Sequence, residues 1–271
     1  ELGFRDIVLW DIRIACFVQH EQGEEALRSF KDMQCQGISL DAIIFSHILR
    51  ACACSGASQK GKEIHAKISN NLLKKDITLG TALIDMYVKC SALSKAQELF
   101  DDLTIPDTIA WNALIAGYAQ IGQVKASLNA FHKMVEQGSK PDDITFLLLL
   151  TACNHAGLVA EGEMCFHIMT IEYYLIPTLE QYTCMVDLFS RAGHFDKAMI
   201  LIEEVLPCNR FQLLLALLAA CRQWINLDLG RWIFQHLEQL DGENAAAYVC
   251  ISNIFAGVHM QDEVNYDEEG K

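Results

Sequence analysis

His236 and Glu238 come nearest to a catalytic motif in this sequence. In zinc-dependent deamination of a nucleobase, a His-x-Glu pair supplies one metal ligand and the general acid/base, and a following Pro-Cys-x-x-Cys segment supplies two more ligands. No Cys-x-x-Cys occurs, and Pro207–Cys208 precedes the His-x-Glu pair, with Arg210–Phe211 where the second Cys would fall. We therefore predict no zinc site. The nine histidines form no recognisable set with a nucleophile, so we also predict no catalytic residue and no enzyme activity.

The eleven cysteines raise the question of a metal or disulfide framework. Their spacing does not favour one, and several fall on apolar faces of the expected helices: Cys16, Cys153, Cys184 and Cys221. Unpaired cysteines behave as small apolar core residues. We predict reduced thiols of this kind, which indicates a reducing compartment, and we predict no cofactor.

A helical pattern recurs along the chain every 31 to 36 residues. Each repeated segment contains two helical stretches and opens with an apolar or aromatic residue that precedes a small polar one. The opening blocks of four segments are Val8–Trp10, Thr78–Ile84, Ile109–Ile115 and Tyr182–Val186. Self-similarity at this spacing is typical of a solenoid, in which each unit buries its apolar face against its neighbours. With helix formers dominant and only 4 prolines, we predict an all-α fold, a right-handed α-solenoid of helix-turn-helix repeats.

The unit 108–142 shows the plan of one repeat. Its pattern predicts a first helix over 111–120, a break at Gly122, a second helix over 124–136 and an end at Gly138. The same plan fits the unit 7–41, with breaks at Gly23 and Gly37. The expected repeats are 7–41, 42–76, 77–107, 108–142, 143–178 and 179–209, so a cycle of 35, 35 and 31 residues is followed by one of 35, 36 and 31.

The net charge of −14 argues against nucleic-acid binding if the chain is taken as a whole. The charge is uneven, because residues 143–271 carry −12 and residues 1–142 carry −2. One stretch, 42–75, is basic and opposed only by Glu63: Arg50, Lys60, Lys62, Lys67, Lys74 and Lys75. Such a strip can meet phosphates or be a solvated helix face. No apolar run approaches the ~20 residues that cross a bilayer, so we expect no membrane partner.

Several of these motifs resemble the pentatricopeptide repeats of land plants: Trp111–Tyr118, Ile84–Cys90 and Gly61–Ala66. The cycle of long and short units resembles the PLS subclass, and Met185–Gly193 resembles its last short repeat. Leu217–Arg222 and Tyr248–Ala256 resemble the E-domain motifs that follow such arrays. The resemblance covers about residues 7–257. It implies a repeat array over 1–209, E-domain motifs over 210–257 with the second incomplete, and an acidic, disordered tail over 258–271.

The resemblance also implies which residues read RNA. In this family the fifth and last residues of a repeat recognise one base, and a residue at the second position holds the face of the base. The paired positions are Asp11/Asp41, Ser46/Asp76, Thr81/Asp107, Asn112/Asp142, Leu147/Thr178 and Thr183/Asn209. The sandwiching residues are Val8, Ile43, Thr78, Ile109 and Ile144.

The family code suggests guanine for Thr81/Asp107, uracil for Asn112/Asp142 and adenine for Thr183/Asn209. The Leu147 side chain cannot hydrogen-bond, so we predict that its repeat tolerates any base. The predicted core is 5′-G-U-N-A-3′, and the first two pairs stay ambiguous. Helix capping is the alternative role for three of the polar residues, since they lie near helix starts: Thr81, Asn112 and Thr183.

By resemblance, the function is that of a sequence-specific adaptor on single-stranded RNA in a mitochondrion or chloroplast. It would take part in C-to-U editing with a cytidine deaminase recruited in trans, together with organellar editing cofactors. The sequence begins at Glu1 in mid-pattern, so we expect it to be part of a longer protein that also holds the transit peptide. Two alternatives stay open: a protein-binding helical-repeat scaffold, and a truncated, non-functional copy.

Overall fold

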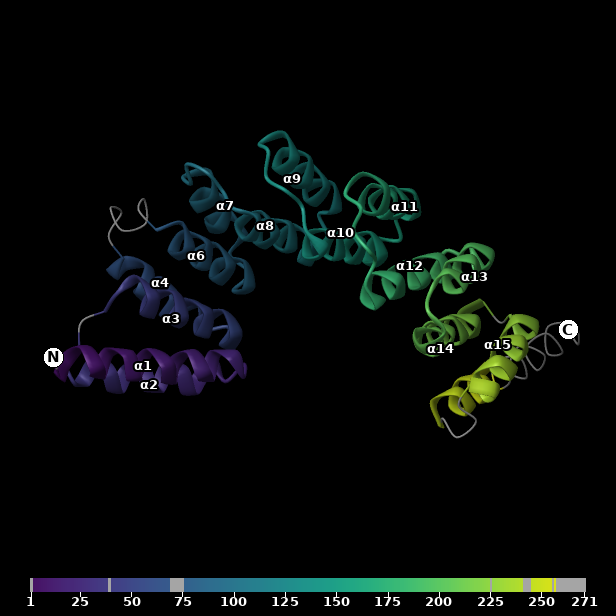
Figure 1. Cartoon of the computed structure of the whole chain (residues 1–271), viewed down its shortest axis with the longest axis horizontal. Helices are drawn as coiled ribbons and strands as arrows, with labels where there is room; N and C mark the ends of the chain where they lie inside the picture. The colour runs from purple at the N-terminus through teal and green to yellow at the C-terminus, as the bar shows by residue number, and fades with distance from the viewer. Residues whose placement is uncertain are drawn as a thin grey trace, which may run out of the picture. The chain divides into compact units, whose positions relative to one another are not determined.

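The computed structural model describes residues 2–38, 40–68, 76–224, 226–240, 245–254 and 256 (Figure 1). All regular elements in these residues are helices joined by short connections, which confirms the predicted all-α class. Lys74, Lys75 and the expected tail 258–271 lie outside the described residues. The chain forms two compact units, Glu1–Leu148 and Leu149–Lys271.

The first unit is built from helix pairs in two layers (Figure 1). Helix α1 packs on α3, α3 on α6 and α6 on α8, and these form the layer of first helices. The second helices cover the junctions between them; α7, for example, contacts both α6 and α8. The bounds are α1 Leu2–Gln19, α2 Gly23–Cys35, α3 Ala42–Ser55, α4 Ser58–Lys67, α6 Ile77–Lys89, α7 Leu93–Asp101, α8 Thr108–Gln120 and α9 Val124–Glu136, followed by the start of α10 Asp143–Ala156.

The core of this unit lies between the layers. Helix α8 contacts α6, α7 and α9, and it is apolar on most sides because nearly all of its sides are covered. Trp111 is 2% exposed and meets Phe100 of α7 edge to face, with 4.6 Å between ring centroids. The preceding helices are buried in the same way, for example at Leu83 and Ile84 of α6. Each repeat is therefore completed by its neighbours.

Repeat length follows from helix length. The first helices α6 and α8 both have 13 residues, whereas the second helices α7 and α9 have 9 and 13. The four residues that distinguish a 31-residue from a 35-residue repeat thus correspond to about one turn of the second helix. In the repeat 143–178, α11 (Val159–His167) continues into a π-helical turn, η1 (Ile168–Glu172). The extra residue of this repeat coincides with that wider turn.

Glycines end several helices, but Gly23 has another role. Gly122 and Gly138 lie in the left-handed region, with φ of 74° and 78°, as expected of residues that stop a helix. The predicted break at Gly23 is wrong: the chain turns at Glu21, with φ of 57°, and Gly23 is the first residue of α2. A Cβ at Gly23 would lie 2.7 Å from the carbonyl oxygen of Ala51, so glycine permits α2 to approach α3.

The second unit contains the rest of α10, then α11, η1, α12 (Leu179–Arg191), α13 (Phe195–Glu204), α14 (Pro207–Trp224) and α15 (Leu227–Leu240). Residues 245–254 are helical as well. Helix α14 contacts α12, α13 and α15, and the apolar stretch near its middle is buried at four leucines: Leu213, Leu214, Leu217 and Leu218. Large apolar side chains also remain exposed in this unit, among them Trp224 and Trp232.

The cysteines whose side chains the structure describes are free thiols. Cys153 and Cys221 are buried as predicted, and Cys184 is half-buried. Cys16 is exposed, contrary to the prediction, because it lies two residues from both Ile14 and Val18. These two residues of α1 are buried, so Cys16 falls on the opposite side of the helix. Burial raises the pKa of the Cys52 thiol to about 12, so this thiol stays protonated at neutral pH. No described helix has the length and apolar composition that crossing a membrane requires.

Candidate nucleic-acid interface

In the five repeats from 7–41 to 143–178, the last residue caps the first helix of the next repeat. In each case a side-chain oxygen accepts a hydrogen bond from the backbone N–H three residues later, which would otherwise have no partner within the helix. The distances are 2.9 Å for Asp41, 3.2 Å for Asp76, 2.8 Å for Asp107, 2.9 Å for Asp142 and 3.4 Å for Thr178. The capping expected as an alternative for Thr81, Asn112 and Thr183 therefore falls on the last position of the preceding repeat instead.

Two of the paired positions are in direct contact. Thr81 Oγ1 donates to Asp107 Oδ1 over 3.3 Å. In the next repeat Asn112 Nδ2 donates to Asp142 Oδ1 over 3.0 Å. Each contact joins the fifth residue of a first helix to the cap of the following first helix, so the stacking of α6, α8 and α10 brings the two side chains together.

A third residue, Thr145, completes the Asn112/Asp142 pair. Thr145 Oγ1 lies 2.6 Å from Asn112 Oδ1 and 2.9 Å from Asp142 Oδ1, and it accepts a hydrogen bond from the backbone N–H of Asp142 over 3.1 Å. Thr145 is fully buried and Asn112 is 7% exposed. Thr145 is not among the residues that the family resemblance predicts for the site. The spacing Asp-x-x-Thr at a helix start was the available signal, because each of these side chains can accept from the backbone N–H of the other, as in a capping box.

The charge of Asp142 is stabilised in this arrangement. Burial alone would raise the pKa of its carboxyl, but hydrogen bonds from the Thr145 N–H and the Asn112 amide lower it, and the pKa lies below its usual range. Asp142 is therefore ionised at neutral pH. In this site the described hydrogen bonds to the carboxylate all end on Asp142 Oδ1, and none of them ends on Oδ2. A carboxylate oxygen at this place can accept from an N–H of a base.

The other predicted pairs are engaged differently. Ser46 Oγ donates to the Ala42 carbonyl over 3.0 Å, and Thr183 Oγ1 donates to the Leu179 carbonyl over 2.7 Å, so both hydroxyls are used within their own helices. Asp11 pairs with His47 of α3, with 2.8 Å between Oδ1 and Nδ1, rather than with Asp41. Leu147 and Asn209 are half-buried. Asn209 does not precede the next helix as predicted, because α14 already begins at Pro207.

The predicted sandwiching residues form an exposed series on the first helices of the first unit. Exposure is 43% for Val8, 58% for Ile43, 66% for Ile109 and 58% for Ile144, and Thr78 is exposed as well. Large aliphatic side chains at regular positions are usually buried. Here an exposed side chain at the second position of the repeat accompanies each predicted pair, and the flat face of a ligand could pack against it.

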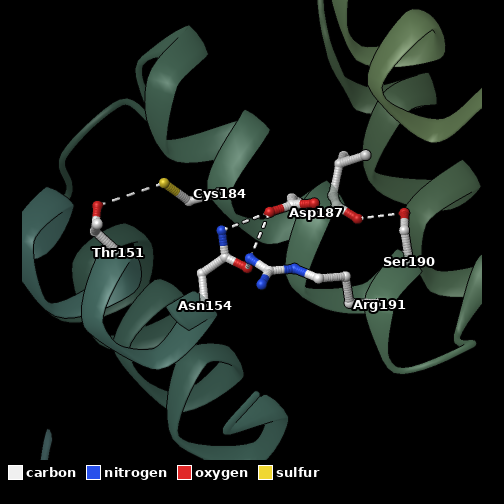
Figure 2. A network of polar contacts seen from close by, with 7 residues as sticks. Thr151, Asn154, Cys184, Asp187, Ser190 and Arg191 are labelled. Carbon is white, nitrogen blue, oxygen red and sulfur yellow. Dashed lines mark hydrogen bonds and ion pairs between the residues drawn. The ribbon is translucent and has the colours of Figure 1, made fainter. Parts of the chain in front are cut away.

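Figure 2 shows a polar network on the first helices of the second unit. Asn154 of α10 donates to Asp187 Oδ2 over 2.9 Å and accepts from Arg191 over 2.6 Å, and Arg191 also binds Asp187 over 2.7 Å. Nearby, Thr151 lies 3.6 Å from the Cys184 sulfur. Asn154 is 8% exposed, so this network fastens α10 to α12 more than it offers free polar groups.

The remaining candidates do not form a site with the paired positions. A hollow of about 150 Å³ lies between α7, α8 and α9, lined by Gln97, Tyr118, Asn129 and Lys133 among others. It contains none of the fifth or last residues. In the basic strip, Lys60 is paired with Glu63, while Arg50, Lys62 and Lys67 are exposed.

The His-x-Glu pair is engaged in local contacts. His236 Nδ1 lies 2.8 Å from the Trp232 carbonyl oxygen, and Glu238 accepts from the Tyr248 hydroxyl over 3.3 Å. Within the part of the chain that the structure describes, no three His, Cys, Asp or Glu side chains gather in a way that could hold a metal ion.

The fold matches solved helical-repeat structures. The crystal structure of PPR10 from maize aligns with a TM-score of 0.77 at 14% identity, over 95% of this chain and 37% of that chain. A crystal structure of PPR10 in complex with an 18-nt psaJ RNA element aligns with a TM-score of 0.64 at 23% identity, over 72% of this chain and 29% of that one. The fold is therefore an α-solenoid of helix-turn-helix repeats.

Sequence comparisons give the family. The PPR repeat family model matches residues 106–155, the pentatricopeptide repeat domain matches 28–90, and the PPR repeat matches 8–38, 81–104 and 182–206. The chloroplastic pentatricopeptide repeat-containing protein CRR2 of Arabidopsis thaliana is 34% identical over 96% of this chain and 40% of its own length. Another pentatricopeptide repeat-containing protein of that plant is 39% identical over 97% of the chain and 48% of its own length. The chain belongs to the pentatricopeptide repeat family and spans less than half the length of these two relatives.

Proposed function

We propose that this chain binds single-stranded RNA through the first helices of its repeats. The observation that carries the proposal is the combination, in two successive repeats, of a hydrogen-bonded polar pair and an exposed side chain at the second position. Asn112 lies on α8, the helix that carries Ile109, and Asp142 caps α10, the helix that carries Ile144. Two aliphatic side chains can hold the faces of one base while the polar pair meets its Watson–Crick edge. The RNA-bound structure of the related fold, PPR10, supports the same class of ligand.

The assignment of bases rests on the family code. Thr81/Asp107 would read guanine and Asn112/Asp142 uracil, the Leu147 repeat would accept any base, and Thr183/Asn209 would read adenine. Each good contact to a base edge contributes about 1–3 kcal/mol of discrimination. Three read positions in this chain thus give a modest preference, and additional repeats of a longer protein would sharpen it.

We place the chain in the PLS subclass, with E-domain motifs over 210–257, as an adaptor in C-to-U editing of organellar transcripts. A cytidine deaminase recruited in trans would supply the chemistry, and organellar editing cofactors would be further partners. This part of the proposal is supported by the cycle of repeat lengths and by the motifs after residue 209. The compartment is a mitochondrion or a chloroplast, and a relative named as chloroplastic supports an organelle.

RNA binding at physiological salt tests the proposal. A short single strand that contains G-U-N-A is compared with one that carries A-C-N-G at the same positions. We expect tighter binding to the first strand, and we expect Asn112→Ser to shift the preference at the second nucleotide toward cytosine. Asn129→Ser on α9 is the matched control, because Asn129 lies in the hollow away from the paired positions.

Equal binding to both strands, or no binding to either, would overturn base reading by this chain. A protein-binding scaffold or a non-functional copy would then account better for the sequence. A scaffold in the manner of tetratricopeptide arrays would be recognised by retention of a peptide on the same first-helix surface, lost in Asn112→Ser.

A further inference from the structure

The Asn112/Asp142 pair differs from the other pairs of the first unit by one buried hydroxyl. The third residue of the following repeat is Ile44 after the first pair, Leu79 after the second and Ala110 after the third. It is Thr145 after Asn112/Asp142, where its hydroxyl contacts both members of the pair.

Donor and acceptor chemistry fixes where the protons of this cluster lie. A carboxylate only accepts, so the NH2 end of the Asn112 amide must face Asp142, and its oxygen must face Thr145. The hydroxyl accepts from the Asp142 N–H, and its single proton has two acceptors within reach, Asn112 Oδ1 at 2.6 Å and Asp142 Oδ1 at 2.9 Å, of which the nearer takes it. At 2.6 Å the contact with Asn112 Oδ1 is an O–H···O hydrogen bond, since two oxygens without a shared proton would repel each other at that distance.

The amide of Asn112 is therefore held at both ends. A flip of the amide would set its oxygen against the Asp142 carboxylate and its NH2 group against the hydroxyl. At the fifth position, Asn112 has a terminal group with two different ends, an NH2 donor and an oxygen acceptor. The fifth residues of the preceding repeats are Asp11, Ser46 and Thr81. A carboxylate has two equivalent oxygens and a hydroxyl can rotate, so neither needs such a lock. The additional hydroxyl of Thr145 thus occurs in the repeat whose fifth residue is an amide that could adopt two orientations.

We propose that Thr145 is a third specificity-determining residue of the Asn112/Asp142 position, which it serves by holding the Asn112 amide in one orientation. This inference rests on the proposed RNA-binding function. Uracil and cytosine differ at N3, which is an N–H donor in uracil and an acceptor in cytosine. A flip of the Asn112 amide exchanges its NH2 donor for its oxygen acceptor, so it would change which of the two bases, uracil or cytosine, is preferred. Thr145 acts through Asn112 and is a positioning residue.

The test compares two strands that differ only at the second read nucleotide, G-U-N-A and G-C-N-A. Binding is measured for the whole chain and for Thr145→Val, which keeps the shape of the side chain without its hydroxyl, and for Thr145→Ser, which keeps the hydroxyl. We expect the preference for uracil over cytosine to fall about three- to tenfold in Thr145→Val, the range that one hydrogen bond provides. Thr145→Ser should stay within about twofold of the native preference.

A merely structural role predicts a different result. If Thr145 only caps α10, Thr145→Val lowers the melting temperature but leaves the ratio of the two affinities unchanged, and this outcome overturns the inference. The preference for guanine over adenine at the first read nucleotide, set by Thr81/Asp107, is the internal control and should not change. Thr145→Ala is a second variant, measured in the same way, for the case that the valine variant does not fold.

A double-mutant cycle makes the coupling explicit. In an Asn112→Ser background there is no amide to orient, so Thr145→Val should have no further effect on the ratio of uracil to cytosine affinity. An effect of equal size in both backgrounds would contradict a role through Asn112. If the native chain binds neither strand, the proposed function fails first and the inference falls with it. Native discrimination with unchanged Thr145→Val discrimination rejects the inference alone.

Discussion

Lys89 forms an ion pair with Asp85 one turn earlier in α6, with 3.0 Å between Nζ and Oδ2. The two residues are the thirteenth and ninth of the repeat 77–107, and Arg191 and Asp187 form the same pair at the same positions of 179–209. Both repeats have 31 residues, and the longer repeats carry no acid and base at these two positions. With the acid first and the base four residues later, such partly exposed pairs stabilise a helix by about 0.3–0.5 kcal/mol.

Asn154 makes the second of these pairs more consequential than the first. Replacing Asn154 by Ala removes one hydrogen bond to Asp187 and one from Arg191, both to charged partners (Figure 2). We expect Asn154→Ala to lower the free energy of unfolding by about 1–3 kcal/mol, measured by urea denaturation. Thr151→Val on the same helix is the control, since it removes only a 3.6 Å contact with sulfur. Equal loss in the two variants would show that the network adds no stability.

Asp142 should give stability that depends on pH. Its folded pKa is depressed, so its ionised form is favoured by folding, and the contribution is complete above the unfolded value of about 3.8. The contribution is lost as the pH falls through the lower, folded pKa. We expect the melting temperatures of the native chain and Asp142→Asn to differ by a constant amount between pH 5 and 7, and to converge below about pH 4.

The matched control for this measurement is Asp143→Asn, which changes the neighbouring exposed acid in the first turn of α10. A difference between the native chain and Asp142→Asn that persists unchanged into the acid range would mean that the carboxylate charge contributes nothing. In that case the lost cap geometry alone would explain the effect of the substitution.

Ile109 separates binding from folding. Its side chain is 66% exposed, so Ile109→Ala should leave the melting temperature within about 2 °C of the native value, because little apolar area leaves the core. Binding to the G-U-N-A strand should weaken by about three- to tenfold, since the face of one base loses an apolar contact. Ile105→Ala is the control, as Ile105 is 72% exposed but precedes the helix. Equal effects of both changes on binding would exclude a specific contact at Ile109.

Apolar spacing and glycine positions predicted the helices of the repeat 108–142 to within three residues, since α8 begins at Thr108 rather than at 111. The pattern over 124–136 predicts a helix, and α9 covers Val124–Glu136. These signals are local, because a helix face and its end depend on residues within a few turns. The role of Gly23 was not predictable in this way. It depends on the approach of Ala51 from the next repeat, and that distance is a property of the packed helices.

The candidate interface was only partly predictable for the same reason. Resemblance to the family supplied the paired positions, and the structure brings Thr81 to Asp107 and Asn112 to Asp142. Asp11 instead meets His47, a residue of the next helix that the periodic pattern gave no reason to select. Which polar groups meet across two helices depends on their stacking and on their competing partners, and the sequence spacing specifies neither.

Capping also limits how a repeat array of this kind can change its target. Under the proposed function, the last residue of each repeat from Asp41 to Thr178 has two roles. It takes part in base recognition, and it also caps the first helix of the next repeat. Asp, Asn, Ser and Thr are the side chains that cap a helix well, so substitutions at this position are limited to a few residue types. The fifth residue caps nothing, and it varies far more widely along the chain: Asp, Ser, Thr, Asn, Leu and Thr. New specificities, natural or engineered, should therefore arise first at the fifth residue.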